Sequence, residues 1–274
     1  MKRVGVITDS SACLPAELVS KLGICVLPIS VFLSEDGDNG VSELDGPDLP
    51  EALATEELAG ANHPFVTEYL EAIETPGFDA AVLVTPAIEF STMYRNAALA
   101  AEFSSRPAIS IDARTAAAGQ ALVVLAGAES AAAGAEMDEV VRVIEDATRR
   151  VELVASLASL EEIRRSGPVS DDVLGAGSPS TRSIFRMCGG SVEPLGVATT
   201  ADEALDVMHD AYITSAPHGA ERSTVFHANA PALAEKLRNL IGGVDFVSGF
   251  SVAMQIHTGG GVVGAAWIPR SDPA

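Results

Sequence analysis

The chain has 274 residues, of which 47% are hydrophobic, and carries a formal net charge of -21 at pH 7. This length and apolar content are enough to bury one large core or two moderate ones. The negative charge argues against nucleic acid as a partner and against docking on anionic membranes, because both surfaces are bound through clustered Lys and Arg side chains.

The sequence carries no targeting or membrane signal that we recognise. Only about seven residues lie between the basic start of the chain and its first polar cluster, which is too few for the apolar region of a signal peptide. The Ala-rich stretch 116–135 is interrupted by Gln120 and Glu129, so it is not a membrane span. We therefore expect a cytoplasmic protein without stable membrane insertion. The cysteines show neither zinc-ligand spacing nor a disulfide framework, and we expect no metal.

The chain begins with an apolar strand that ends in a cluster of polar side chains. These side chains are Thr8, Asp9, Ser10 and Ser11. They follow the carboxyl end of the strand, where ligands bind in open parallel α/β sheets. Asp9, Ser10 and Ser11 could equally cap the next helix, which Pro15 at its first position and Gly23 just past its end place over residues 16–22.

Strands and helices alternate through the rest of the first half, which predicts a parallel, doubly wound sheet. We expect strands over residues 26–33, 80–84 and 108–111, and helices over residues 64–77, 91–103, 116–133 and 138–150. The carboxylate-rich segment 34–57 contains glycines and prolines and predicts an exposed loop with a short helix. It is either a solvated acidic face or a surface for a basic partner protein.

The pattern changes near residue 150, where we place the boundary between a parallel-sheet domain (1–150) and a smaller α+β domain (151–274). The expected elements are a strand over 151–157, a helix over 160–165, a Gly-, Pro- and Ser-rich run over 166–181, a strand over 192–197, a helix over 201–213, a strand over 223–227, a helix over 231–241, and strands over 246–252 and 262–267. This order suits a smaller sheet with helices on one face. The cleft between the halves is the natural ligand site.

Residues 259–264 match the G-x-G-x-x-G string of dinucleotide-binding loops but lack its context. Such a loop follows a first strand and opens a helix, whereas this string precedes a strand at the end of the sequence. We therefore predict no nucleotide cofactor. The glycines, Gly259 among them, instead allow the backbone to approach a ligand or the other domain closely. His257 and Thr258 just before them are then expected at a strand end that faces the cleft.

Several stretches match the motifs of one known family in order and spacing. They are the N-terminal block 4–31, Ser91-Thr-Met-Tyr-Arg-Asn-Ala97, the segment 151–170, His227-Ala-Asn-Ala-Pro-Ala-Leu-Ala234 and Gln255-Ile-His-Thr-Gly-Gly-Gly-Val-Val-Gly264. Through these motifs the chain resembles the DegV family of bacterial fatty-acid-binding proteins. The resemblance covers almost the whole chain.

The resemblance implies a DegV-like two-domain fold that holds one long-chain fatty acid, with the acyl tail in the first domain and the carboxyl group near the domain interface. It also implies a role as the binding subunit of a fatty acid kinase, which presents the carboxyl group to a separate ATP-using subunit. Ser91 matches the serine that contacts the carboxyl group, although a serine there can also be a helix N-cap. His257 would lie beside the carboxyl group and take part in phosphoryl transfer.

The chain departs from the family at motifs that carry hydroxyl and basic side chains. Where the family has Thr-Ser-Gln-Pro-Ser, this chain has Ala61-Asn62-His63-Pro64-Phe65, in which Asn62 can still donate a hydrogen bond from its amide. Arginine-bearing motifs become residues 166–169 and 198–201, so side chains that would steady an acyl phosphate or meet the kinase subunit are missing there. Candidate replacements are Arg164, Arg165, Arg182 and Arg186.

Two other functions are compatible with the sequence. Ser91, His257 and Asp9 could form the triad of a hydrolase, although the G-x-S-x-G elbow is missing. Alternatively, the acidic first half could dock a basic partner in a regulatory module. Fatty acid binding is the leading hypothesis, because burying an acyl chain contributes roughly 0.8 kcal/mol per methylene before ordering costs are subtracted.

Overall fold

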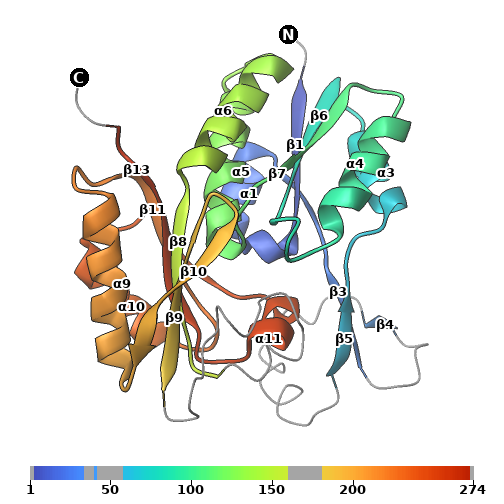
Figure 1. Ribbon diagram of the computed structural model, residues 1–274. Coiled ribbons are helices and arrows are strands. Elements are labelled where there is room, and N and C mark those ends of the chain that lie inside the picture. Colours follow the sequence, from blue (N-terminus) through green and yellow to red (C-terminus); the bar gives the residue numbers. More distant parts are fainter. Residues whose placement is uncertain (1–2, 34–39, 42–57, 160–180, 272–274) are drawn as a thin grey trace.

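The computed structural model describes residues 3–33, 40–41, 58–159 and 181–271. Within these ranges two large sheets and their helices are stacked in layers (Figure 1). The acidic segment 34–57, the helix predicted over 160–165 and the run 166–181 lie almost wholly outside the described residues. Among the helices in the described ranges, none combines the length and apolar character that a membrane crossing needs.

The first large sheet has four parallel strands in the order β2-β1-β6-β7. They are β1 (Val4–Asp9), β2 (Cys25–Leu27), β6 (Ala80–Thr85) and β7 (Ala108–Asp112). The central strands β1 and β6 are buried along their whole length, as continuous apolar runs are in a sheet covered on both faces. One face packs on α3 (Val66–Ile73) and α4 (Met93–Phe103), and the other packs on α1 (Ala16–Leu22), α5 (Ala117–Ala132) and α6 (Met137–Arg150) (Figure 1). The predicted parallel, doubly wound sheet is confirmed.

The strand predicted over 26–33 is in fact two strands in different sheets. Strand β2 ends before Pro28, which has no backbone N–H to continue a ladder. The next N–H, that of Ile29, is donated to Ser10 Oγ at 2.9 Å. The chain then resumes in a small antiparallel sheet made of β3 (Ser30–Leu33), β4 (Gly40–Val41) and β5 (Leu58–Asn62).

The second large sheet has six strands in the order β10-β9-β8-β13-β11-β12. They are β8 (Glu152–Leu157), β9 (Arg182–Cys188), β10 (Ser191–Ala198), β11 (Ala220–His227), β12 (Phe246–Gly249) and β13 (Val263–Pro269). Helices α9 (Ala201–Ser215) and α10 (Pro231–Ile241) cover its outer face, and α5 covers its inner face (Figure 1). As expected, the helices α9 and α10 of this half lie on one face of its sheet. The sheet is not the smaller one, because it has six strands, and β9, whose apolar pattern is interrupted by Arg182 and Arg186, was not predicted.

The strand predicted over 246–252 ends early and gives way to a helix. Strand β12 ends at Gly249, and the side chain of Ser251 accepts the N–H of Met254 at 3.4 Å, which caps helix α11 (Val252–Thr258). His257 and Thr258 therefore lie in the last turn of a helix. The expected strand end at these residues was wrong.

Helix α5 is shared by the two halves of the chain. It is buried along most of its length, and its Leu122 belongs to one continuous core with Val82 of the first large sheet and Leu153 of the second. A helix that is apolar all round must be buried on all sides. The predicted boundary near residue 150 falls between α6 and β8. That the chain forms a separate domain on each side of this boundary stays a prediction.

Gly264 in β13 should tolerate no side chain, because a Cβ there would meet the carbonyl oxygen of Val154 at 2.5 Å as well as the ring of Phe226. We expect Gly264→Ala to lower the free energy of unfolding by about 1–3 kcal/mol, measured by urea denaturation. Gly260→Ala is the matched control, because its added Cβ would meet nothing within 4 Å. Equal losses in the two variants would contradict this explanation.

Candidate functional site

A cavity of about 270 Å³ lies where the first large sheet, the small sheet and the second large sheet meet. Its apolar wall is formed mainly by Phe90, Met93, Phe185, Met187, Val192 and Met254. Its polar side chains are Ser11, His63, Ser91, His257 and Thr258. Asp, Glu, Lys and Arg are absent from the lining that the structure describes. The cavity therefore has one polar region on an otherwise apolar surface.

The polar region brings together a serine and two histidines from three separate elements. Ser91 Oγ lies 3.4 Å from Nδ1 of His63, and the ring centroids of His63 and His257 are 6.4 Å apart. Ser91 precedes α4 and accepts the N–H of Met93 at 3.1 Å. This hydrogen bond lets Ser91 support the start of the helix while it lines the cavity, so the two roles expected from the sequence are compatible.

Both histidines of the cavity are disposed to be neutral. Burial lowers the pKa of His63, and the neighbouring His257 lowers it further. Burial also lowers the pKa of His257. A neutral imidazole offers one N–H donor and one acceptor nitrogen. An anion placed between these rings would favour their protonated forms, so the cavity can take up a proton together with an anion.

Ser11 connects the cavity to a buried polar network. Its N–H donates to Asp9 Oδ1 at 3.0 Å, and its hydroxyl contacts the same oxygen. From α5, Gln120 Nε2 donates to Thr8 Oγ1 at 3.0 Å and to Asp9 Oδ2 at 3.1 Å. Burial raises the pKa of the Asp9 carboxyl, and the hydrogen bonds from Ser11 and Gln120 oppose that rise. Asp9 caps the short helix η1 (Ser10–Ala12) and not α1.

Some of the other predicted site residues lie away from the cavity. Asn62 is exposed and outside the cavity lining, and its neighbour His63 takes the place expected for it. Successive residues of an extended segment point in opposite directions, and this alternation is the signal that could have identified His63. Gly259 ends α11 with a φ of 71° and also lies outside the lining. Thr258 lines the cavity while its hydroxyl donates to the carbonyl of Met254 at 2.9 Å.

The hydrolase triad considered from the sequence is not assembled. The carboxylate of Asp9 is hydrogen-bonded to Ser11 and Gln120, and Asp9 is outside the cavity lining to which Ser91 and His257 belong. The side chain of Ser91 faces His63. This geometry gives no support to a Ser91–His257–Asp9 hydrolase.

The two candidate arginines within the described residues, Arg182 and Arg186, do not line the cavity. Arg182 donates to Ser156 Oγ at 2.9 Å and to the carbonyl of Gly261. Arg186 forms an ion pair with Glu152 at 2.7 Å. Both side chains lie outside the cavity lining, and Arg164 and Arg165 fall outside the described residues. Within the described ranges, His, Cys, Asp and Glu side chains form no group of three or more that could hold a metal ion.

A family model for DegV, described as "Uncharacterised protein, DegV family", matches residues 3–270. The chain belongs to the DegV family. A DegV domain-containing protein of Streptomyces coelicolor is 27% identical over 273 residues, which cover 96% of this chain and 97% of the relative. Another, from Mycobacterium tuberculosis, is 29% identical over 283 residues, which cover 99% of each.

Solved DegV structures share the fold of this chain. A DegV lipid binding protein from Thermotoga maritima has a TM-score of 0.86 at 19% identity, with 99% of this chain and 100% of that chain covered. A DegV family protein from Thermus thermophilus, described as binding fatty acid, has a TM-score of 0.83 at 23% identity, covering 97% and 99%. A stearic acid-binding protein from Eubacterium ventriosum has a TM-score of 0.83 at 16% identity, covering 98% of each. The predicted DegV-like fold is confirmed.

In this DegV family member, the difference in unfolding free energy between Asp9→Asn and wild type should depend on pH. Burial raises the pKa of Asp9 above its unfolded value, so the native state loses stability as pH rises and the charge forms inside the protein. Asparagine carries no such charge. We expect the unfolding free energy of Asp9→Asn relative to wild type to rise as the pH increases above the unfolded pKa of about 4, measured by urea denaturation at about pH 4 and about pH 7. The exposed Asp206→Asn is the control, and an equal pH dependence in both variants would contradict the expectation.

Proposed function

We propose that this DegV protein binds a fatty acid, with the carboxyl group at His63, Ser91 and His257 and the acyl chain along the apolar wall of the cavity. The observation that carries the proposal is the single neutral polar region on an otherwise apolar cavity. Solved relatives with the same fold are described as binding fatty acid, stearic acid and vaccenic acid.

The polar region has the donors that a buried carboxylate requires. A carboxylate taken from water must be hydrogen-bonded. Ser91 Oγ accepts the N–H of Met93, so its own proton can be donated to a ligand oxygen. Ser91 Oγ and His63 Nδ1 lie 3.4 Å apart and share one hydrogen bond, so this pair offers one donor to the carboxylate, and the carboxylate in turn favours protonation of the rings. A permanent cation is therefore unnecessary for binding.

A long acyl chain needs more room than the cavity has in this structure. Its volume of about 270 Å³ lies just below the roughly 300–1,000 Å³ typical of ligand pockets. Met93, Met187 and Met254 line it, and methionine side chains are unbranched and adapt to irregular shapes. We infer that these three side chains move to extend the cavity along the acyl chain.

We expect Ser91→Ala to weaken fatty acid binding by about tenfold or more, because a hydrogen bond to a charged group contributes about 1.5–3 kcal/mol. The measurement is retention of labelled stearate by the delipidated protein. Thr92→Ala is the matched control, because Thr92 is exposed, adjacent and makes no side-chain capping bond. Unchanged retention in Ser91→Ala, or an equal loss in both variants, would overturn the assigned role of Ser91.

We further propose that the bound carboxyl group is presented to a separate kinase subunit. A carboxylate oxygen would attack the γ-phosphorus of ATP, the bond to the bridging oxygen would break, and ADP would leave with the electron pair. The resemblance in sequence and the place of His257 in the polar region support this step. Because Arg182 and Arg186 are engaged elsewhere, the positive charge for the transferring phosphoryl group would come from the kinase subunit and its nucleotide-bound metal.

We expect His257→Gln to reduce acyl phosphate formation by about 100-fold, because the attacking carboxylate loses the imidazole that orients it, while stearate retention changes only a few fold. The assay combines the stearate-loaded protein, ATP and a bacterial fatty acid kinase catalytic subunit, and traps acyl phosphate with hydroxylamine. The exposed His218→Gln is the control. Full acyl phosphate formation with His257→Gln would contradict the proposed role of His257. If the wild-type protein yields no acyl phosphate, the proposal that it presents the carboxyl group to a kinase subunit is overturned, but the proposal that it binds a fatty acid is not.

A further inference from the structure

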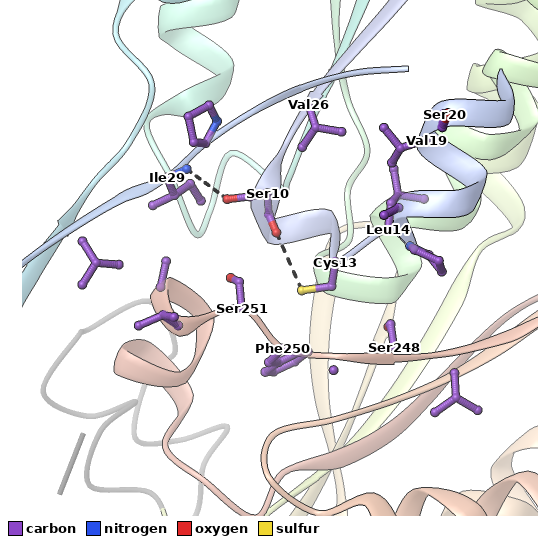
Figure 2. A pocket seen from close by; sticks show the side chains of 18 residues that line it. Ser10, Cys13, Leu14, Val19, Ser20, Val26, Ile29, Ser248, Phe250 and Ser251 are labelled. Atoms are coloured by element: carbon purple, nitrogen blue, oxygen red, sulfur yellow. Dashed lines mark hydrogen bonds between the residues drawn. The ribbon is translucent and has the colours of Figure 1, made fainter. Parts of the chain in front are cut away.

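A second and larger cavity lies next to the first. Its volume is about 610 Å³, within the range typical of ligand pockets, whereas the first cavity has about 270 Å³. It opens between the segment η1–α1 and the segment β12–α11, as Figure 2 shows, and we call it the α1–β12 cavity. The room that a long acyl chain lacks in the first cavity is therefore available beside it.

The wall between the two cavities is thin and apolar. Ile29 and Ala253 each line both cavities. They belong to a small buried cluster with Met93, which lines the first cavity, and with Val31 and Val252, which line the second. This cluster is separate from the main core around α5. Few side chains must therefore move for a ligand to extend from one cavity into the other.

Helix α11 runs along both cavities. Met254, His257 and Thr258 line the first cavity, and the residues 251–253 that precede them line the α1–β12 cavity. Ala253 precedes His257 by one turn, so the two side chains lie on the same face of the helix, about 6 Å apart along its axis. A carboxyl group held at His257 therefore places the first carbons of its acyl chain near the wall, with the larger cavity beyond.

The surroundings of Ile29 allow the wall to open without unfolding of the backbone. The N–H of Ile29 is donated to Ser10 Oγ at 2.9 Å, and a change of side-chain rotamer leaves this hydrogen bond intact. Beyond the wall, Leu14, Val26 and Phe250 are among the apolar side chains around the cavity (Figure 2). Methylene groups that reach this cavity would be removed from water by these side chains.

We propose that the acyl chain of a long-chain fatty acid passes between Ile29 and Ala253 into the α1–β12 cavity, which makes the protein selective for long chains over short ones. This inference rests on the function proposed above, in which His63, Ser91 and His257 hold the carboxyl group. A short chain such as that of octanoate lies within the first cavity. Each methylene that a longer chain buries beyond the wall strengthens binding by up to about fourfold.

Cys13 reports whether an acyl chain occupies the α1–β12 cavity. It is half-buried and lines this cavity but not the first. We expect bound stearate to slow alkylation of Cys13 by iodoacetamide about fivefold or more, because the chain covers the thiol, and saturating octanoate to leave the rate unchanged. Peptide mass spectrometry follows each cysteine separately. Cys188 on β9 lies outside the described linings of both cavities and is the internal control.

Two variants of the wall should change stearate binding in opposite directions. Val252→Phe enlarges a side chain just beyond the wall, so we expect stearate binding to weaken about tenfold or more while octanoate binding is unchanged. Ile29→Ala removes a side chain that must move, and stearate binding should strengthen about threefold or more. Ile24→Ala is the matched control, because Ile24 is similarly buried and lines neither cavity.

The outcomes separate this inference from the function on which it rests. If the wild-type protein binds neither stearate nor octanoate, both are overturned. If stearate binds but the alkylation of Cys13 keeps its rate, the acyl chain lies elsewhere, and only the route into the α1–β12 cavity is overturned. Equal loss of stearate and octanoate binding in Val252→Phe would also overturn the route. Urea denaturation checks that each variant folds, and the alkylation test uses the wild-type protein alone.

Discussion

The packing of helix α5 between two sheets is the constraint on which the rest of the structure depends. The helix is apolar on nearly every side, so both sheets must close on it to remove its surface from water. Gly127 allows α6 to approach closely, because a Cβ there would meet the side chain of Ile144. The start of α5 places its N-cap residue Ala116 in the wall of the smaller cavity and Gln120 of its first turn against Asp9. Core packing and site geometry are therefore set by the same helix.

The local charge at the cavities differs sharply from that of the chain as a whole. The protein has a formal charge of -21, yet the described linings of both cavities lack Asp, Glu, Lys and Arg. Within the described lining of the smaller cavity the titratable groups are His63 and His257, and burial lowers the pKa of both. The polar side chains in the described lining of the larger cavity are serines and Cys13.

Much of the fold could be predicted from local sequence signals. Helix α1 has the expected bounds because Pro15 and Gly23 mark its ends. The buried strands β1 and β6 were identifiable as short apolar runs between helices. The signals failed where pairing is non-local. Strand β9 pairs with β8 across the sequence in between, and the chain between β2 and β3 crosses from one sheet to another at Pro28.

The sequence by itself determined the family, the alternation that builds the parallel sheet, and the importance of Ser91 and His257 as candidates. Only the tertiary structure decided that His63 joins them while Asn62 faces solvent, and that Asp9 lies behind Ser11. Motifs and helix caps depend on residues that are close together in the sequence, so they can be identified from the sequence. A cavity is formed by side chains from segments far apart in the chain, and their distances are fixed only when both sheets pack against α5.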